Sequence, residues 1–307
     1  MKRYDVIAIG ELNVDLIMTG LKNMPVPGRE IIAEKGSLVL GSSTAICASG
    51  LARLGLKTAF MGKVGRDDFG RTVLEALQNN GIDTSMVITD GNIRTGITVS
   101  LSTPNDRALA TYLGSIESLD RDDINLEAVS SSRHIHIGSY FLQHRLRPYI
   151  PELFSWARNN GITTSLDAGW DESENWDYGI SDALKYTDIF LPNETEALNI
   201  AGKDNVNAAI EVLSEYTGIV AVKCGSKGAV GKWNGRVIAQ EPFDLKPVDT
   251  TGAGDSFNAG FIYGFLKGYD LRKCMTYGNA CGSISVTRIG GASSCATLEE
   301  VKRLAGE

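Results

Sequence analysis

The alternation of short apolar runs with longer runs of helical spacing is the feature that most constrains the fold of this chain. Buried-strand patterns are expected at residues 4–9, 58–64, 133–138, 162–166, 188–191 and 219–223. Helical spacing is expected between them at residues 43–54, 67–80, 147–160, 193–201 and 205–216. Strands joined through helices run parallel and need a helical layer on each face. The pattern predicts an α/β fold, a three-layer sandwich with a central, mainly parallel sheet.

The last third of the chain continues this architecture. Residues 227–232 and 236–240 are expected to pair as antiparallel strands around an Asn234-Gly235 turn. Three helices should follow, at residues 253–267, 270–288 and 297–305. Because no linker interrupts the pattern, we expect one domain that spans residues 1–307.

Two segments, residues 11–40 and 94–113, break the alternation. The second carries β-forming residues on both sides of a polar turn, which is typical of a hairpin. Both segments are expected to form a separate small sheet. That sheet would be either a lid over a binding cleft or a simple hairpin appendage.

Composition restricts the possible partners and the compartment. The 307 residues are 43% hydrophobic, which is enough for a sizeable core, and carry a net charge of −7. This charge argues against nucleic acid or an anionic membrane as the main partner. The first apolar run is too short for a signal peptide or a membrane span. The cysteines are odd in number and form no CxxC pair, which fits a reducing cytoplasm: Cys47, Cys224, Cys274, Cys281 and Cys295.

The run VDTTGAGDSFNAGF, residues 248–261, points to phosphoryl transfer. Gly252, Ala253 and Gly254 stand where a helical pattern begins, so their N–H groups should form an anion cradle. Asp255 then falls in the first turn, where its carboxylate could act as a general base. The helix N-terminus is expected to lower the pKa of this carboxyl. In the alternative interpretation, Thr250 or Thr251 merely caps the helix and Asp255 complements its dipole.

Other polar residues follow or lie within predicted strands. Asp15 comes just beyond the first strand, where ligands gather in open α/β sheets, and its two oxygens could accept hydrogen bonds from adjacent hydroxyls. A solvated loop acid is the alternative. His134 and His136 are expected to face opposite sides of a strand and to form no metal site together.

The combination of Asp249, Thr251, the Gly-Ala-Gly triplet and Asp255 resembles a signature of the ribokinase-like (PfkB-type) carbohydrate kinases. Further segments resemble the family in the same order: GKVGRDDFG at 62–70, LPNETEA at 191–197 and VKCGSKGAVG at 222–231. The resemblance spans nearly the whole chain and implies a ribokinase-like α/β domain with a small β-sheet lid.

The resemblance also implies roles for individual residues. Asp255 would be the base and Gly252, Ala253 and Gly254 the anion cradle, while Asp15, Gly41 and Ser42 would bind the substrate. ATP binding would fall to Asn193, Lys223, Gly225, Gly228 and Asn279. Glu196 would hold Mg²⁺ through water, and Asp249 and Thr251 a monovalent cation such as K⁺. A capping box is a second explanation for Asn193 and Glu196, and the two explanations are compatible.

Departures from the family pattern concern the acceptor. Gly41 matches the usual Gly-Gly pair, but Ser42 replaces the second glycine and Ile46 the usual asparagine. The segment after Asp167 lacks the Asn and Arg that several hexose and keto-sugar kinases place there. The substrate of a named kinase therefore does not transfer to this chain.

The leading hypothesis is an ATP- and Mg²⁺-dependent kinase that phosphorylates a hydroxymethyl group of a small sugar or sugar acid. A nucleoside kinase of the same fold and a non-catalytic, metabolite-binding regulatory protein are the alternatives. No dinucleotide glycine fingerprint follows the first strand, which argues against a dehydrogenase. By resemblance, the lid strands are expected to pair between subunits in a homodimer.

Overall fold

A computed structural model describes residues 2–103 and 107–307. Its main sheet has nine strands in the order β13-β12-β11-β10-β9-β8-β1-β4-β5, and the strands from β11 to β5 are parallel. The strands are β1 (Tyr4–Ile9), β4 (Thr58–Gly65), β5 (Asp83–Asp90), β8 (Ser132–Ile137), β9 (Thr163–Leu166), β10 (Ile189–Phe190), β11 (Ile219–Lys223), β12 (Ala229–Trp233) and β13 (Arg236–Gln240). The predicted parallel sheet is confirmed. No apolar run marks the edge strand β5, because polar residues interrupt it.

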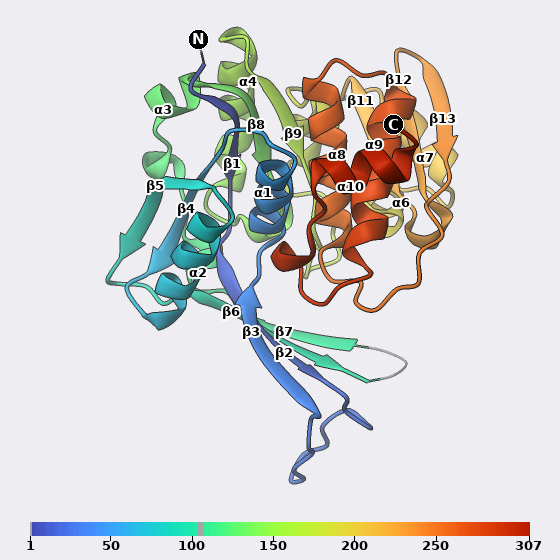
Figure 1. The fold of residues 1–307 in the computed structure, drawn as a ribbon. Helices are drawn as coiled ribbons and strands as arrows, with labels where there is room; N and C mark the ends of the chain where they lie inside the picture. Colours follow the sequence, from blue (N-terminus) through green and yellow to red (C-terminus); the bar gives the residue numbers. More distant parts are fainter. Residues whose placement is uncertain (1, 104–106) are drawn as a thin grey trace.

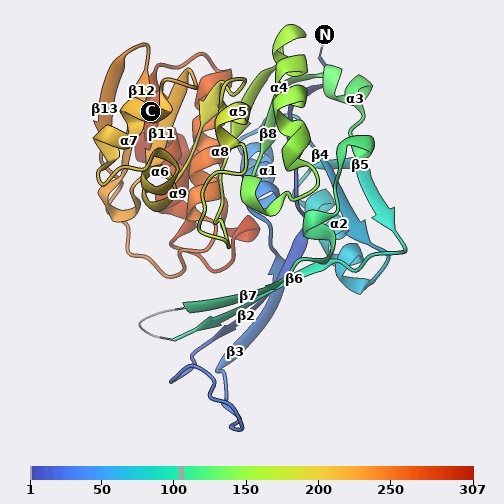
Figure 2. The same ribbon diagram turned by 180° about the vertical axis from the view of Figure 1, so that it is seen from behind.

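Helices cover both faces of this sheet, as predicted (Figure 1, Figure 2). One face carries α1 (Ser43–Arg53), α2 (Asp68–Asn79), α8 (Ala253–Leu266), α9 (Leu271–Ser285) and α10 (Leu298–Ala305). The other carries α3 (Leu126–Ser130), α4 (Ile150–Asn159), α5 (Ile180–Leu184), α6 (Glu194–Ala201) and α7 (Val206–Leu213). Short 3₁₀ turns lie at Gly114–Glu117, Arg121–Asp123, Tyr140–Leu142, Arg147–Tyr149, Gly225–Lys227 and Ala292–Ser294.

Local sequence signals explain most element ends. Gly81 and Gly161 follow α2 and α4 with φ of 77° and 67°, a conformation that glycine adopts freely. Asn234 and Gly235 both have positive φ in the predicted turn between β12 and β13. The helix α9 ends at Ser285, three residues earlier than expected. It stops there because the Val286 carbonyl accepts hydrogen bonds from the N–H groups of residues 248 and 249.

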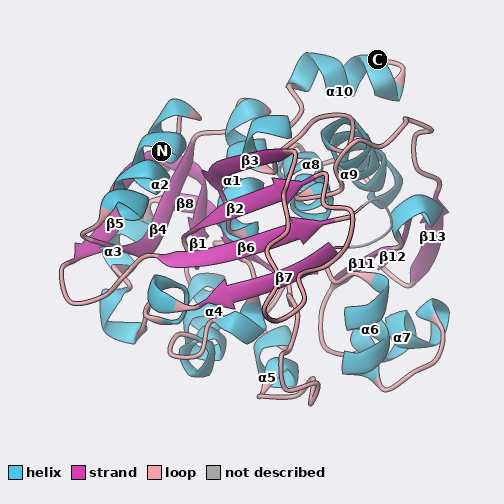
Figure 3. Cartoon of the chain, turned by 90° about the horizontal axis from the view of Figure 1, so that it is seen from below, coloured by secondary structure: helices cyan, strands magenta, loops and turns pink. Residues whose placement is uncertain are grey.

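A second sheet projects from one end of the molecule (Figure 1), and its strands lie side by side in the view from below (Figure 3). Its strands are β2 (Asn13–Thr19), β3 (Lys35–Leu40), β6 (Gly96–Ser102) and β7 (Arg107–Tyr112), in the order β3-β2-β6-β7. The expected small sheet is thus confirmed, although residues 104–106 of the predicted segment lie outside the described residues. Asp67, which caps α2, also accepts hydrogen bonds from the backbone and hydroxyl of Thr95 and so fastens the root of β6.

The two faces of this small sheet differ in chemistry. One cross-strand row contains Val39, Asp15, Thr98 and Thr111, of which all but Val39 are polar. The neighbouring row, on the opposite face, contains Leu38, Leu16, Val99 and Ala110, which are apolar. The small sheet therefore has a polar face, which carries Asp15, and an apolar face. In the described part of the chain, no helix combines the length and apolar character that crossing a membrane requires.

Candidate active site

Loops at the carboxyl ends of the parallel strands bring the polar residues together. Glu11 follows β1, Asp167 follows β9, and Lys223 is the last residue of β11. The N-terminus of α8, with Asp255 in its first turn, meets the same group. This is the edge at which open α/β sheets bind their ligands.

The start of α8 forms an uncapped helix N-terminus. Gly252 occupies the N-cap position with φ of 74°, and a glycine has no side chain with which to cap the helix. The alternative in which Thr250 or Thr251 provides the cap is therefore wrong. A β-carbon on Gly252 would lie 2.9 Å from the Cα atom of Gly291 and 3.1 Å from a methyl carbon of Ile46. Glycine is thus required for the close packing. The Ala253 N–H donates to the Thr250 carbonyl oxygen at 3.3 Å, while the start of the helix, which has no side-chain cap, is suited to an anion.

Asp255 is half-buried among other charged groups. Burial, with the negative charge of Asp167 second, raises the pKa of Asp255 from 3.8 to about 8, against the opposing effect of the Lys223 ammonium. The expectation of a lowered pKa is wrong, because burial and neighbouring carboxylates outweigh the helix dipole. A hydrogen bond with the side chain of Ser43, the first residue of α1, opposes the rise and links Asp255 to that helix.

A buried ion pair between Lys223 and Asp167 lies near Asp255. The Lys223 Nζ atom lies 2.5 Å from Asp167 Oδ2 and 3.2 Å from Asn258 Oδ1, and the Asn258 amide donates to the same Asp167 oxygen at 2.7 Å. Although burial raises the pKa of Asp167, Lys223 and Asn258 outweigh it and the pKa is lowered. A β-carbon on Gly254 would lie 3.6 Å from Lys223 Nζ, so this ammonium group borders the anion cradle.

Asn193 and Glu196 form a reciprocal capping box at the start of α6. The Glu196 carboxylate accepts from the Asn193 backbone N–H at 2.8 Å and from its amide at 2.6 Å, and Asn193 Oδ1 accepts from the Glu196 N–H. The capping explanation is therefore confirmed. Burial, followed by the charge of Asp167, raises the pKa of Glu196 to about 7. Such an undercompensated carboxylate is also suited to a cation.

Asp15 and Gly41 are in direct contact at the root of the small sheet. A β-carbon on Gly41 would lie 2.2 Å from Asp15 Oδ1, so only glycine leaves room for this carboxylate. The Asn13 amide donates to the same oxygen at 2.8 Å. Ser42, the N-cap of α1, follows directly and leads to Ser43. A continuous segment thus connects Asp15 with Asp255.

Two of the residues assigned to ATP, Gly228 and Asn279, meet at the end of β13, whereas Asn193 forms a backbone bridge with Lys223. The Asn279 amide donates to the carbonyl oxygens of Gln240 and Glu241 at 3.0 and 2.9 Å. A β-carbon on Gly228 would lie 2.2 Å from the same Gln240 carbonyl oxygen. Gly225 lies in the tight turn after Lys223, with φ of 57°. Gly228 and Asn279 are therefore near one another, and the turn after β11 joins them to Lys223.

Asp249 fixes the loop behind the anion cradle. Its Oδ1 atom accepts from the Thr251 N–H at 2.9 Å and its Oδ2 atom from the Gly290 N–H at 3.0 Å. The carboxylate thus joins the segment of Thr251, which the resemblance assigned to a monovalent cation, to the loop of Gly290. Each oxygen retains a second lone pair.

Sequence reasoning missed several polar residues that the structure brings to this site. Asp167 was noted only as part of a departure from the family, and Glu11 and Asn258 were not singled out. Asp167 and Glu11 both follow a strand closely, which is the signal that identified Asp15. Asn258 lies in α8, one turn after Asp255, where nothing in a single sequence distinguishes it from a core position.

The prediction that His134 and His136 face opposite sides is wrong. Both rings lie 2.8 Å from the Ser165 hydroxyl, because residues two apart share a strand face. Burial lowers the pKa of His134 to about 3 and that of His136 to about 4, so both are neutral. No group of three His, Cys, Asp or Glu side chains suited to a metal ion occurs among the described residues.

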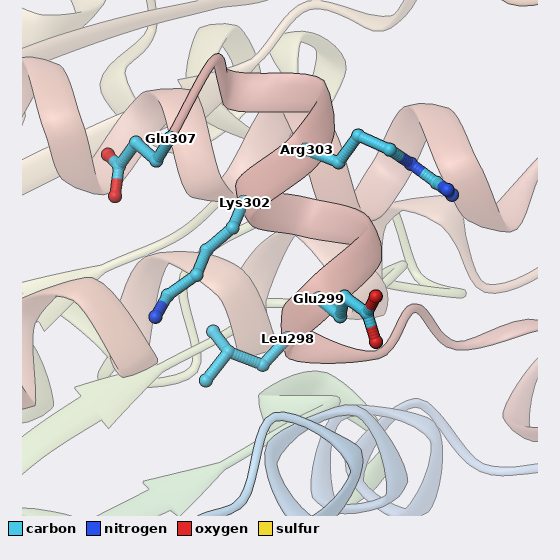
Figure 4. Close-up of a pocket in the computed structure, with 5 residues that line it drawn as sticks. All are labelled: Leu298, Glu299, Lys302, Arg303 and Glu307. Carbon is cyan, nitrogen blue, oxygen red and sulfur yellow. The ribbon is translucent and has the colours of Figure 1, made fainter.

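A surface hollow elsewhere does not share these features. It lies on α10, lined by Leu298, Glu299, Lys302, Arg303 and Glu307 (Figure 4). Figure 4 shows their charged side chains extending in different directions rather than converging. The hollow contains none of the predicted site residues. The cluster around Asp255 is therefore the candidate active site.

An anion cradle at a helix start, an adjacent carboxylate and a small sheet at the same end of a parallel sheet define the class of ribokinase-like sugar kinases. The model of the pfkB family carbohydrate kinases matches residues 3–298, and the chain belongs to this family.

Individual relatives agree with this assignment. An uncharacterized sugar kinase of Archaeoglobus fulgidus is 34% identical over 247 residues, which cover 78% of this chain and 96% of that protein. A 5-dehydro-2-deoxygluconokinase of Geobacillus thermodenitrificans is 28% identical and covers 98% of this chain and 93% of its own. The fold matches that of an Arabidopsis thaliana ribokinase solved with ribose and ATP, with a TM-score of 0.84, 24% identity and 99% coverage of both chains. An E. coli protein solved with ATP and Mg²⁺ has a TM-score of 0.87, 23% identity and 99% coverage of both chains.

Proposed function

We propose that this protein is an ATP-dependent phosphotransferase that phosphorylates a hydroxymethyl group of a small sugar or sugar acid, with Asp255 as the base. One observation carries the proposal. Asp255 stands in the first turn of α8, beside the anion cradle of Gly252, Ala253 and Gly254 and within reach of the segment that leads to Asp15. An acceptor held by Asp15 and a phosphoryl group held by the cradle would meet at this carboxylate.

The chain's own groups divide the reaction between them. Asp15 and Gly41 orient the acceptor, and Asp255 accepts the proton of its attacking hydroxyl. The first-turn amides of α8 and the Lys223 ammonium face the charge that spreads over the transferring phosphoryl oxygens. A pKa of about 8 makes Asp255 a better proton acceptor than an ordinary aspartate, at the cost of a smaller ionised fraction at neutral pH. The small sheet would exclude water when substrates are bound.

The donor set suits ATP, Mg²⁺ and a monovalent cation. Glu196 combines two carboxylate oxygens with a raised pKa of about 7, so a nearby cation would stabilise its ionised form. When bound, Mg²⁺ neutralises the charge of the nucleotide phosphates. Asp249 and Thr251 would hold K⁺ or a similar ion. Gly225, Gly228, Asn193 and Asn279 would line the nucleotide side.

Names of relatives guide the choice of acceptor. The full-length match to a 5-dehydro-2-deoxygluconokinase favours a sugar-acid-like acceptor, and a Haemophilus influenzae ribokinase, 28% identical over 97% of both chains, favours a pentose. Ser42 and Ile46 replace residues of the family's sugar-binding pattern. The acceptor of neither relative is therefore assigned to this chain, and the acceptor has to be measured.

The decisive experiment is ATP consumption against a panel of sugars, sugar acids and nucleosides, with wild-type protein and Asp255→Asn. We expect one or a few acceptors to stimulate ADP formation, and turnover to fall on the order of 10²-fold or more in the variant. Stimulation by a nucleoside alone would redirect the proposal to a nucleoside kinase. A protein that binds a metabolite but never consumes ATP would be a regulator.

We also propose a homodimer formed through the small sheet. Its apolar face carries Leu38, 43% exposed, and Tyr112, 56% exposed, beside Leu16 and Val99. A second copy would cover this apolar surface, which is costly to leave in water. Leu38→Glu should shift the sedimenting species from dimer to monomer, whereas a wild-type monomer at high concentration would refute the proposal.

A reducing cytoplasm is the proposed compartment. All five cysteines are free and buried. Free cysteines support this proposal, because an oxidising compartment favours disulfide formation. Localisation of the tagged protein by fractionation tests this.

A further inference from the structure

Glu11 is a buried carboxylate that the proposed reaction leaves without a role. It lies two residues after the end of β1, and only 2% of its surface is exposed. A carboxylate this deep is costly unless hydrogen bonds compensate its charge. The hydrogen-bond partners of Glu11 therefore indicate its role.

Donors from two separate parts of the chain converge on this carboxylate. From α1, the Thr44 N–H and hydroxyl donate at 3.1 and 2.6 Å. From the loop after β8, the Ser139 hydroxyl donates at 3.1 Å and the Gln143 amide at 2.9 Å. The Ser42 hydroxyl lies 2.6 Å from the Glu11 backbone oxygen and 3.1 Å from its carboxylate. The Thr44 N–H and the Gln143 amide N–H can only donate, so the Glu11 carboxylate accepts from both, which suits its ionised form. Burial raises the pKa of Glu11, and the hydrogen bonds from Thr44 and Ser139 oppose this rise.

Backbone geometry at two of the donors is unusual. Ser42 and Ser139 have φ of 69° and 51°, in the left-handed region that residues other than glycine rarely adopt. Both direct their hydroxyls to the same carboxylate. Such conformations persist where surrounding contacts enforce them, and they cluster at functional sites.

The helix terminus that these bonds secure also fits closely against the main sheet. β-Carbons on Gly10 and Gly138 would lie 2.6 and 2.5 Å from the Thr44 hydroxyl. The start of α1 therefore rests on the ends of β1 and β8, with Glu11 between them. This same terminus begins with Gly41, which contacts Asp15, and includes Ser43, whose side chain is hydrogen-bonded to Asp255.

We propose that Glu11 is a positioning residue of this kinase: its carboxylate fastens the start of α1 to the loop after β8 and so holds the acceptor-side Gly41 in place relative to Asp255. The inference rests on the proposed function, in which Asp255 is the base. A displacement of about 1 Å between an acceptor and its base can reduce the rate on the order of 10²-fold.

The charge of Glu11 affects the pKa of Asp255, and a purely structural role of Glu11 would not produce this effect. The ionisable groups that face Asp255 are Glu11 after β1, Cys47 on α1, Asp167 after β9, Lys223 on β11 and Cys295. Burial raises the pKa values of both thiols, so they remain neutral. The negative charge of Glu11 raises the pKa of Asp255, and its removal should favour the ionised base at lower pH.

The test uses Glu11→Gln, which preserves the shape of the side chain and removes its charge. We expect kcat/KM for the acceptor to fall about 10- to 100-fold, and the acid limb of its pH profile to move to lower pH. Asp188→Asn is the matched control, because Asp188 also accepts a backbone N–H, from Thr164 at 2.7 Å, but precedes β10 at the opposite end of the strands. This control should leave the pH profile unchanged.

Ser139→Gly guards against a folding failure of the first variant. It removes one donor to Glu11 at a position whose positive φ glycine adopts without strain, so melting temperature should hold while kcat/KM falls. The double variant should lose less than the product of the two single losses, since both changes act through one network.

The outcomes separate the two proposals. Wild-type kcat/KM and an unmoved acid limb in Glu11→Gln, together with inactive Asp255→Asn, would overturn the role of Glu11 alone. An active Asp255→Asn variant would overturn the base assignment, and a wild-type protein without ATP turnover would overturn both.

Discussion

Asp255→Asn should stabilise the protein while it removes activity, and the gain should depend on pH. The pKa of this carboxyl is raised from 3.8 to about 8, so the folded protein holds its proton more tightly than the unfolded chain does. Between these two values unfolding releases a proton, and stability falls as pH rises. The penalty is absent below about pH 4 and complete above about pH 8. Asparagine carries no such proton and escapes the penalty.

The size of the effect follows from the same numbers. Each pH unit between 3.8 and about 8 is worth about 1.36 kcal/mol, which sets a ceiling of about 6 kcal/mol. Because the side chain is only half-buried, solvent screens part of this penalty and we expect about 2 kcal/mol. For a chain of this size, that corresponds to a rise in melting temperature of about 4 °C at pH 9.

Thermal unfolding of wild type and variant at pH 5, 7 and 9, without nucleotide or metal, is the assay. Asp167→Asn is the matched control with the opposite sign. Its pKa is lowered, so its charged form stabilises the fold above pH 3.8 and this contribution is lost as pH falls. Removal of the charge leaves Lys223 buried without its carboxylate partner and should cost about 3–5 kcal/mol at pH 7. Parallel pH dependence in wild type and Asp255→Asn, or stabilisation by Asp167→Asn, would refute the reasoning.

Three further predictions concern the reaction. Gly41→Ala should raise KM for the acceptor at least about tenfold, with KM for ATP unchanged, because its β-carbon would displace Asp15; equal changes in both constants would contradict the assignment. Glu196→Gln should increase the Mg²⁺ concentration needed for half-maximal rate about tenfold, and an unaltered Mg²⁺ titration would argue against Glu196 as a metal-side group. In the wild type, kcat/KM for the acceptor should rise with pH toward a limb near pH 8, because the ionised form of Asp255 accepts the proton; a flat profile from pH 6 to 9 would show that another group limits the rate.

The sequence predicted the architecture well because its apolar periodicities are strong and its helix ends are marked. Gly81, Gly161 and the Asn234-Gly235 turn each require positive φ, and each was placed correctly. The edge strand β5 was not predicted because it is only partly buried and carries polar residues among its apolar ones. The early end of α9 depends on a distant contact with residues 248 and 249, which local pattern does not contain.

The proposed phosphoryl-transfer end was also marked in the sequence, because a glycine-flanked helix start and an acid occur together within a few residues. The surroundings of Asp255 could not be predicted from the sequence. Its raised pKa depends on burial and on Asp167, which is 88 positions away in the sequence yet adjacent in space. The Glu11 network likewise joins residues more than a hundred positions apart. Single-sequence patterns describe neighbours along the chain, and these effects arise from neighbours across the fold.

The alternation of polar and apolar residues in β2 and β6 has an evolutionary consequence. Asp15 and Thr98 lie on one face of these strands, and Leu16 and Val99 on the other. Point substitutions on the Asp15 face can therefore alter the proposed acceptor contacts without disturbing the surface proposed for self-association, and substitutions on the opposite face can do the reverse. An insertion or deletion of one residue would exchange both faces at once. The strands of this small sheet should therefore diverge among related proteins by residue substitution rather than by changes in strand length.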